Sequence, residues 1–217
     1  MIRSPFFVIE NAISAIKCDL IINELGLKVP SLDENNKPLK YERLVADSEL
    51  KGFIHSAVDA NRSLLEERFN GTIGQLETPL FQQYFENPEV PAEKHGCENS
   101  KFIRKKWVKV KDIDIVGYLW LKDYNNSVPL DPRFETYGGK LEFPAYDFSL
   151  VPQRGTMVLF PGGPHFITAV SPILVGTFEV IKICFKLNTA DGTPWTYKPS
   201  LFGGTYVEWF AQEEARQ

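Results

Sequence analysis

Before residue 71, apolar side chains recur at helical spacing in two stretches. The first stretch covers residues 15–25, where an apolar residue returns every three or four positions, and Gly26 ends it. The second stretch follows Asp47 or Ser48, either of which can cap a helix, and Asn70-Gly71 stops it. The pattern therefore predicts two helices, each burying one face.

Beyond residue 71 the pattern changes to short apolar runs separated by Gly, Pro and Asn. Runs of this kind are typical of β-strands joined by turns. Two helices followed by about eight strands indicate helices packed on one face of a β-sandwich or jelly roll. We therefore predict a mainly β fold, a double-stranded β-helix (jelly roll) with N-terminal helices. The predicted strands cover residues 5–10, 72–77, 80–85, 101–111, 113–122, 140–144, 156–160, 166–171 and 177–187.

The chain of 217 residues is predicted to form a single domain. We expect a helical layer over about residues 11–70 and a jelly-roll core over about residues 71–188. The tail, residues 189–217, is aromatic, Gly-rich and irregular, and we expect it to cover an edge or the outside of the barrel.

Composition indicates the class of protein and the cellular compartment. The hydrophobic fraction of 43% and charged fraction of 24% are ordinary for a globular protein, and the net charge of −4 gives no global reason to expect nucleic-acid binding. Cys18, Cys97 and Cys184 are odd in number and far apart, so we expect no disulfide framework and a reducing cytoplasm. We expect no signal peptide and no membrane association, because no suitable apolar run is present.

The most informative stretch is residues 155–170, GTMVLFPGGPHFITAV. Its first half is almost wholly apolar, which is typical of a strand buried on both faces. Residues 161–164 (PGGP) then force a turn, and His165 follows at the turn's exit before a second strand. A histidine held at the end of a rigid strand is well placed to act as a metal ligand.

Three histidines occur in the chain, at positions 55, 95 and 165. His55 lies within the second predicted helix, and we assign it to structure. His95 lies in a polar stretch with one cysteine and two glutamates, between two predicted strands. A jelly roll brings such strand ends together, so His95, His165 and one carboxylate could form a facial triad with open positions for Fe(II) chemistry.

Several motifs resemble those of the Fe(II)/2-oxoglutarate-dependent oxygenases, specifically the prolyl-4-hydroxylase-like branch found in bacteria and phages. The resemblance runs from about residue 5 to residue 188, and the last two of its motifs are specific when taken together and in order. The motifs are residues 5–9 (PFFVI), 117–124 (GYLWLKDY), 137–144 (YGGKLEFP) and 152–155 (PQRG) followed by 159–161 (LFP) and His165.

The resemblance implies an iron site formed by His95, Glu98 and His165. The family's first metal motif is His-x-Asp or His-x-Glu, and the spacing from His95 to Glu98 is one residue longer. A local bulge would allow both to bind, and Glu98-Asn99-Ser100 resembles the family's acid-Asn-Ser run. The alternative is that Glu93 supplies the carboxylate ahead of the histidine.

The resemblance also implies a cation that binds the far carboxylate of 2-oxoglutarate. Lys182 is the first candidate, because isoleucines flank it in an apolar strand and a buried ammonium group needs an anionic partner. The alternatives are that Lys182 faces outward and that Lys186 takes the role. Tyr118 is expected to complete the pocket.

The implied activity is hydroxylation of a C–H bond, of a prolyl residue or another protein side chain, with release of succinate and CO2. The implied cofactor and cosubstrates are Fe(II), 2-oxoglutarate and O2, and the unidentified substrate is expected to be a protein or peptide in preference to nucleic acid. Two alternatives stay open: a cupin-type metal-binding jelly roll, and a non-catalytic binding module that kept the fold and lost the metal.

Residues 101–111, KFIRKKWVKVK, are predicted to form one basic strand with aromatic residues. The simpler interpretation is the solvated face of an amphipathic strand. The functional alternative is a surface that guides an acidic or nucleic-acid substrate, although Asp112 and Asp114 follow at once and weaken it.

Overall fold

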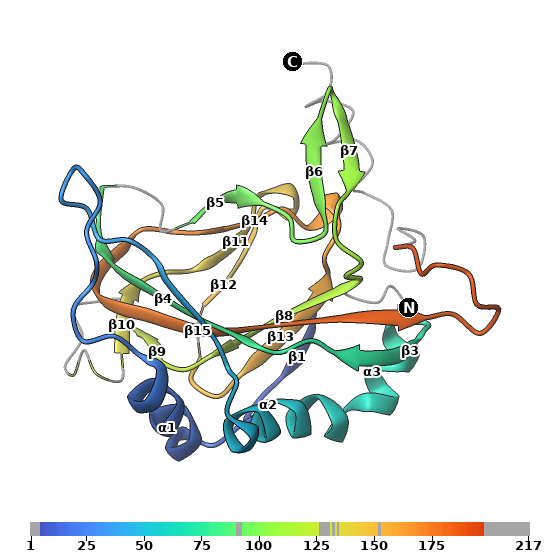
Figure 1. Cartoon of the computed structure of the whole chain (residues 1–217), viewed down its shortest axis with the longest axis horizontal. Helices are drawn as coiled ribbons and strands as arrows, with labels where there is room; N and C mark the ends of the chain where they lie inside the picture. The colour runs from blue at the N-terminus through green and yellow to red at the C-terminus, as the bar shows by residue number, and fades with distance from the viewer. Residues whose placement is uncertain are drawn as a thin grey trace.

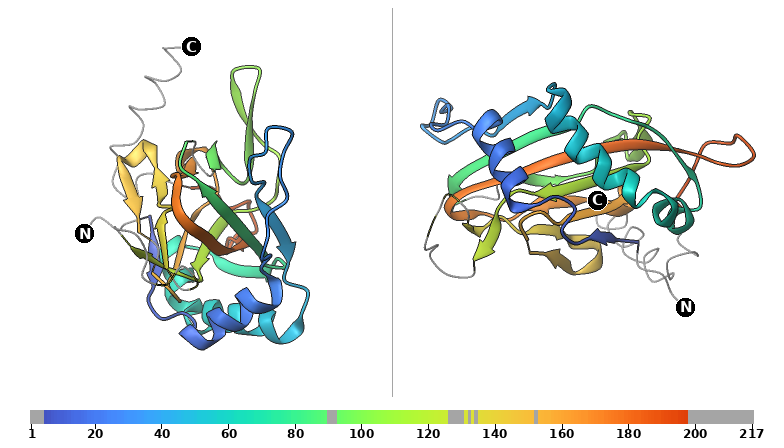
Figure 2. Two further views of the ribbon diagram at one scale, coloured as in Figure 1. Left: turned by 90° about the vertical axis from the view of Figure 1, so that its left-hand side faces the viewer. Right: turned by 90° about the horizontal axis from the view of Figure 1, so that it is seen from below.

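The computed structural model describes residues 5–89, 93–125, 131, 133, 135–151 and 153–197, and for residues 93–96 and 145 it describes the backbone alone. Helices lie under one face of a large curved sheet, and a smaller sheet lies across its other face (Figure 1). Seen from below, the helices run obliquely across the strands that they cover (Figure 2). This is the predicted mainly β fold with an N-terminal helical layer. No helix in the described part of the chain is long and apolar enough to cross a bilayer.

The first predicted helix is confirmed residue for residue as α1 (Ala15–Leu25). The Ser14 hydroxyl accepts a hydrogen bond from the Lys17 amide, which satisfies one of the unpaired N–H groups of the first turn. At the other end the Gly26 amide donates to the Ile22 carbonyl, and the chain leaves the helix in an extended conformation.

The second predicted helix is two helices in the structure, α2 (Ser48–Ala60) and α3 (Arg62–Phe69). Asp47 is its cap, and the carboxylate accepts from two amides of the first turn at 2.9 Å. The break falls at Asn61, whose side-chain amide donates to the Ala57 carbonyl at 3.0 Å. Asparagine competes for backbone hydrogen bonds in this way, which is why apolar spacing alone did not predict the break.

The main sheet has nine strands, and its central members are apolar on both faces because the helices cover one side and the smaller sheet covers the other. The strand order along its longest path is β1-β13-β8-β15-β10-β9, with β4 and β3 also pairing β15, and β2 pairing β4. The strands are β1 (Phe7–Ile9), β2 (Tyr41–Leu44), β3 (Thr72–Leu76), β4 (Leu80–Asn87), β8 (Ile115–Trp120), β9 (Asp123–Asn125), β10 (Glu135–Gly138), β13 (Met157–Pro161) and β15 (Ile173–Asn188).

The smaller sheet has four strands in the order β12-β11-β14-β5. It closes over the main sheet to form the barrel, and the space between the two sheets holds the second hydrophobic core. Its strands are β5 (Glu93–Gly96), β11 (Leu141–Phe143), β12 (Phe148–Leu150) and β14 (Thr168–Val170). The short 3-10 helices η1 (Pro144–Tyr146) and η2 (Pro164–Phe166) lie between these strands along the chain.

The 16-residue strand β15 contributes to both cores because its side chains alternate. Ile181, Ile183 and Phe185 pack in the core beneath the helices. Val180 and Cys184 pack in the core inside the barrel. The residue between those two is Lys182, so the interior face of the barrel is the face that carries this lysine.

Three local predictions need correction. The basic stretch is a hairpin, β6 (Ser100–Ile103) and β7 (Lys106–Lys109), because residues 104 and 105 turn the chain. The expected strand over residues 166–171 is preceded by η2, which contains His165, and begins only at Thr168. The sequence pattern also missed β2, β5, β9, β10 and β12, which are short strands without a clear alternation.

The described part of the C-terminal segment, residues 189–197, packs on the body of the protein. Trp195 is buried in the core beneath the helices and donates from Nε1 to the Phe69 carbonyl at 2.8 Å. Tyr197 lies against Phe166, with ring centroids 4.9 Å apart. These contacts hold Trp195 and Tyr197 against the body of the protein; residues 198–217 lie outside the described part.

Two glycines at the end of β10 allow the chain to pass from the main sheet to the smaller one. Gly138 has φ +92 and Gly139 has φ +75, in the left-handed region that side chains disfavour. A Cβ on Gly138 would lie 2.1 Å from the Pro172 carbonyl oxygen. This contact explains why the Tyr137-Gly138-Gly139 turn needs glycine.

Gly138→Ala should therefore destabilise the fold by several kcal/mol, because backbone strain of about 1–3 kcal/mol adds to a collision with backbone. The matched control is Gly52→Ala in α2, where the new methyl meets nothing within 4 Å. This control should raise stability by about 0.5–1 kcal/mol, the helix penalty of glycine. Urea unfolding of the two variants measures both effects, and equal midpoints would contradict the assignment.

Candidate functional site in the barrel interior

The segments that carry the predicted metal ligands meet at one end of the barrel. Strand β5, which contains His95, pairs with β14, and Gly96 lies opposite Thr168. The loop after β5 touches the turn after β13, since the Asn99 amide donates to the Gly162 carbonyl at 3.1 Å. Residues far apart in sequence are therefore brought to one mouth of the barrel, as the jelly-roll argument predicts.

Asn99 fixes the loop that carries Glu98. Its side-chain amide donates to the Ile113 carbonyl at 2.8 Å, and its own carbonyl accepts from the Val110 amide at 2.7 Å. Its side-chain oxygen accepts from the Ser100 hydroxyl at 2.7 Å. Because Asn99 is buried and fully engaged, the position of the neighbouring Glu98 is well defined.

Glu98 forms ion pairs with two lysines. Its Oε2 accepts from Lys182 Nζ at 2.9 Å, and its Oε1 accepts from Lys111 Nζ at 2.5 Å. The side chains of Glu98 and Lys182 are only 17% and 14% exposed, so this pair is largely removed from water. The structure therefore joins two residues that the sequence predicted for one site, but it joins them directly to each other.

The lysines determine the charge state of Glu98. Burial raises the pKa of its carboxyl, but the ammonium group of Lys182, together with hydrogen bonds from both lysines, lowers it further, and the net pKa is below the usual value. Glu98 is consequently ionised at neutral pH and acts as the counter-ion of Lys182.

Lys182 lies near Tyr118, which the sequence analysis predicted for the same pocket, and near Glu42, which it did not predict. Across the sheet it faces Tyr118 of β8, which stacks on Phe160 with centroids 6.0 Å apart. Burial raises the pKa of the Glu42 carboxyl, but hydrogen bonds from Lys40 and Gln82, with a smaller contribution from the charge of Lys182, hold the net pKa below its usual value. The only sequence signal of Glu42 is a carboxylate in a short polar stretch, which is too weak to single it out.

Glu42 has two direct partners of its own. Lys40 Nζ lies 2.8 Å from its Oε1, and Gln82 Nε2 donates to the same oxygen at 2.6 Å. Lys40 also lies over the ring of Tyr84, 5.0 Å from the centroid. The polar interior thus extends from the Glu98 loop across β15 and β4 to β2.

The remaining predicted residues take different positions. His165 is half-buried in η2, beside the ring of Tyr197 at 5.4 Å between centroids, and burial lowers its pKa so that the neutral imidazole dominates at pH 7. Lys186 is exposed and pairs with Asp112. For His95 and Glu93 the backbone lies in β5, and their side chains are outside the described part.

The described side chains do not fit a divalent metal. No group of three His, Cys, Asp or Glu side chains comes together for one within the described residues. Glu98, the predicted carboxylate ligand, has both oxygens bound by ammonium groups. The neutral ring of His165 has the form that binds metals, but one imidazole is not a facial triad. The predicted ligand set therefore remains a prediction.

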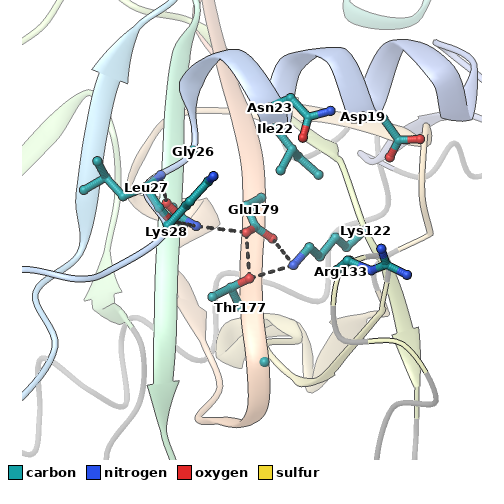
Figure 3. Close-up of a pocket in the computed structure, with 12 residues that line it drawn as sticks. Asp19, Ile22, Asn23, Gly26, Leu27, Lys28, Lys122, Arg133, Thr177 and Glu179 are labelled. Atoms are coloured by element: carbon teal, nitrogen blue, oxygen red, sulfur yellow. Dashed lines mark hydrogen bonds and ion pairs between the residues drawn. The ribbon is translucent and has the colours of Figure 1, made fainter.

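A second polar site lies on the opposite face of the main sheet, at the C-terminal end of α1 (Figure 3). It is an open pocket of about 590 Å³ between α1, β4, β15 and the segment after β8. Its floor is a buried ion pair between Lys122 and Glu179, whose nitrogen and oxygen are 3.1 Å apart. The sequence signal was a carboxylate within the apolar strand β15.

Hydrogen bonds within the fold satisfy much of this second site. The Glu179 carboxylate accepts from Gln83 at 3.0 Å and from Thr177 at 2.6 Å, and Lys122 donates to Thr177 at 2.6 Å. Gln83 also bonds both backbone groups of Leu27, at 2.8 Å and 3.1 Å. The network fastens the segment after α1 to the sheet, and this structural role accounts for its burial.

Comparison with known proteins shows the fold. No protein-family model matches the chain, and no curated protein matches it by sequence. Solved structures do match. The viral collagen prolyl hydroxylase vCPH from Paramecium Bursaria Chlorella virus-1, in complex with 2-oxoglutarate, has a TM-score of 0.60 at 16% identity. The similarity covers 84% of this chain and 95% of that one.

Two further structures agree. A Pseudomonas putida prolyl-4-hydroxylase has a TM-score of 0.56 at 13% identity and covers 85% of this chain and 94% of its own. HygX from Streptomyces hygroscopicus, with nickel and 2-oxoglutarate bound, has a TM-score of 0.51 at 12% identity and covers 94% and 92%. The chain therefore has the prolyl-4-hydroxylase-like fold of the 2-oxoglutarate oxygenases, as its motifs indicated.

The ion pairs of Glu98 predict a pH effect on stability. A carboxyl whose folded pKa lies below its unfolded value stabilises the fold above the unfolded pKa, and this contribution is lost as pH falls through the folded pKa. For Glu98 the loss begins near the ordinary value of 4.5 and continues below it. Glu98→Gln should be less stable than the wild type at pH 7 and show a shallower loss below pH 4.5.

The measurement is urea unfolding at several pH values between 7 and 3. The control is Glu34→Gln, at an exposed glutamate with no ion pair among the described residues, and its profile should follow the wild type. Parallel wild-type and Glu98→Gln profiles would show that the two lysines do not stabilise Glu98 in solution.

A further prediction concerns Lys122. Lys122→Met should destabilise the protein by about 3–5 kcal/mol, because it leaves the Glu179 carboxylate buried without its cation. Lys122→Met combined with Glu179→Gln should recover part of that loss, because no buried charge remains. The exposed Lys28, at the edge of the same pocket, is the control: Lys28→Met should change the free energy of unfolding by less than about 0.5 kcal/mol. A double variant less stable than the single one would contradict this account.

Proposed function

We propose that this chain is a non-catalytic binding module built on the 2-oxoglutarate oxygenase fold. The observation that supports this proposal is the state of Glu98, whose two oxygens are both bound by lysine ammonium groups inside the barrel mouth. A carboxylate in this state serves as a counter-ion, and the interior is a charge-paired polar site.

Electrostatics favours the module over a metal centre at this position. Two unit charges about 4 Å apart interact by about 4 kcal/mol at an effective dielectric constant of about 20. A divalent cation on Glu98 would meet twice that repulsion from each nearby ammonium group. It would also deprive Lys182, which is largely buried, of its anionic partner.

The interior indicates the class of ligand. Lys182 is a largely buried cation on the interior face, 14% exposed, and it lies opposite Tyr118 of β8. Its ammonium group would bind a small molecule that carries a carboxylate, and 2-oxoglutarate is a suitable probe. In a module of this kind the ligand binds to the protein's own lysines and needs no metal.

The second candidate is the hydroxylase that the sequence motifs imply. It is favoured by the meeting of the β5, Glu98 and η2 segments at one mouth, with Lys182 and Tyr118 on the same interior face. His95, Glu98 and His165 would hold Fe(II), and Lys182 with Tyr118 would bind 2-oxoglutarate. When bound, the metal would supply the oxygen chemistry of C–H hydroxylation. Glu98 would first have to release both lysines.

One experiment separates the two candidates. For the module we expect 2-oxoglutarate to bind with the same affinity in EDTA and with Mn(II), as measured by titration calorimetry. Anaerobic addition of Fe(II) and 2-oxoglutarate should give no visible charge-transfer band, and aerobic incubation should release no succinate. Lys182→Met should weaken 2-oxoglutarate binding by about 1.5–3 kcal/mol, the range for a hydrogen bond to a charged group.

The control is Lys28→Met, an exposed lysine on the opposite face of the main sheet, which should bind as the wild type does. A charge-transfer band together with succinate release would establish the hydroxylase and end the proposal of a non-catalytic module. Absence of 2-oxoglutarate binding with and without metal would remove carboxylates of this kind as ligands.

A further inference from the structure

The hairpin formed by β6 and β7 stands apart from both sheets of the barrel. It is a two-stranded sheet of its own, in which Phe102 lies opposite Trp107 and Ile103 opposite Lys106. It extends away from the body of the protein, beyond the smaller sheet (Figures 1 and 2). A two-stranded ribbon without a covering layer is marginally stable by itself, so its exposed side chains are available to a partner.

The hairpin is strongly cationic in an acidic protein. Residues 100–111 contain six lysines and arginines and no acidic residue, whereas the whole chain has a net charge of −4. The acidic residues that follow pair with cations at the base, because Lys109 contacts both Asp112 and Asp114. Lys111 pairs with Glu98, and the described residues show no ion pair for the other four cations, Lys101, Arg104, Lys105 and Lys106.

Apolar groups occupy both faces of the ribbon, but its cations without an ion pair among the described residues lie on one face and at the tip. Because cross-strand partners share a face, Phe102 and Trp107 lie together, with ring centroids 5.4 Å apart. The opposite face carries Lys101, Lys106 and the exposed side chain of Val108. Lys101 belongs to β6 and Lys106 to β7, so a partner that satisfies this face must present negative charge beside both strands and at the tip.

The two residues of the hairpin turn are both cationic, and both have an unfavourable backbone conformation. Arg104 has φ +50 and Lys105 has φ +63, in the left-handed region. A two-residue hairpin turn with both φ values positive strongly prefers Asn-Gly. Two adjacent cations at positions where neither side chain is favoured point to a role for their charge at the tip.

We propose that the β6–β7 hairpin is a nucleic-acid-binding ribbon that enters the major groove of a duplex. That groove is about 12 Å wide and admits a two-stranded β-ribbon, and its phosphate walls place negative charge on both sides. The tip cations together with Lys101 and Lys106 contact phosphates, and Ile103 and Val108 of the same face contact the base edges. An acidic peptide that pairs along one strand leaves the cation of the other strand without a partner.

The hairpin surface is separate from the barrel interior, because none of the four cations belongs to the Glu98 and Lys182 network. The acidic remainder of the protein repels a duplex, so binding is driven by the hairpin alone and depends steeply on salt. Neutralising four phosphates gives a slope of about −3.6 in log affinity against log salt, or about a hundredfold loss between 50 and 200 mM salt.

The test uses the full chain and a fluorescein-labelled 20-base-pair DNA duplex, with anisotropy measured from 20 to 200 mM NaCl. The test variant is Arg104→Asn with Lys105→Gly, which removes two cations and installs the residues that the turn prefers. Its melting temperature should equal or exceed that of the wild type, so a loss of binding is not a loss of folding. The salt slope should fall by about 2.

The charge-matched control is Lys28→Gln with Lys51→Gln, which removes two cations from the helix side of the protein. Duplex binding that is retained in this control and weakened in the turn variant supports the proposal. No binding to the duplex at 20 mM NaCl overturns it, as does an equal loss in both variants. Tighter binding to a poly-glutamate peptide or to anionic lipid vesicles than to the duplex also overturns it and assigns the hairpin to that partner.

Discussion

The alternation of side chains along β15 is the constraint on which the rest of the structure depends. This strand pairs with β4, β8, β3 and β10, so it forms the centre of the main sheet and belongs to both hydrophobic cores. Each side chain on it must face either the helices or the barrel interior, and a shift of one residue would exchange the two sets. The apolar residues fix that register, and the charged residues of the strand follow it.

Two buried charges on β15 consequently lie on opposite sides of one sheet. Lys182 faces the interior and pairs with Glu98, whereas Glu179 faces the helices and pairs with Lys122. Each pair is held by further hydrogen bonds, and each connects a loop to the sheet. The two pairs differ in their surroundings. The network of Lys122 and Glu179 attaches the segment after α1 to the sheet, whereas Glu98 and Lys182 lie at the mouth of the barrel, where several loops meet.

The fold is that of an oxygenase family, whereas the charges in the barrel interior favour a site without a metal. The two observations are compatible, because fold and metal binding depend on different features of the sequence. The fold is specified by patterns of apolar residues, turns and glycines, which do not depend on any metal. A metal centre depends on a few side chains that must be deprotonated and able to coordinate the cation. In this chain the carboxylate at the mouth is balanced by lysines.

The sequence by itself determined the periodic features of this protein. Residues 15–25 formed the predicted helix, and the apolar runs became the buried strands β8 and β13. Local patterns suffice for these because the driving force is burial of apolar side chains, on one face of the helix and on both faces of the two strands. The family motifs then indicated the fold correctly at identities too low for sequence matching.

Only the tertiary structure decided which partners the polar residues take. The sequence placed Glu98 and Lys182 in one site as metal ligand and cosubstrate anchor, but their direct contact spans 84 positions and depends on how two loops meet. The same holds for Lys122 and Glu179, and for the turn at Arg104 that divides the basic stretch into two strands. The physical reason is that periodicity reports the environment of a face, whereas an ion pair depends on the distance between particular atoms.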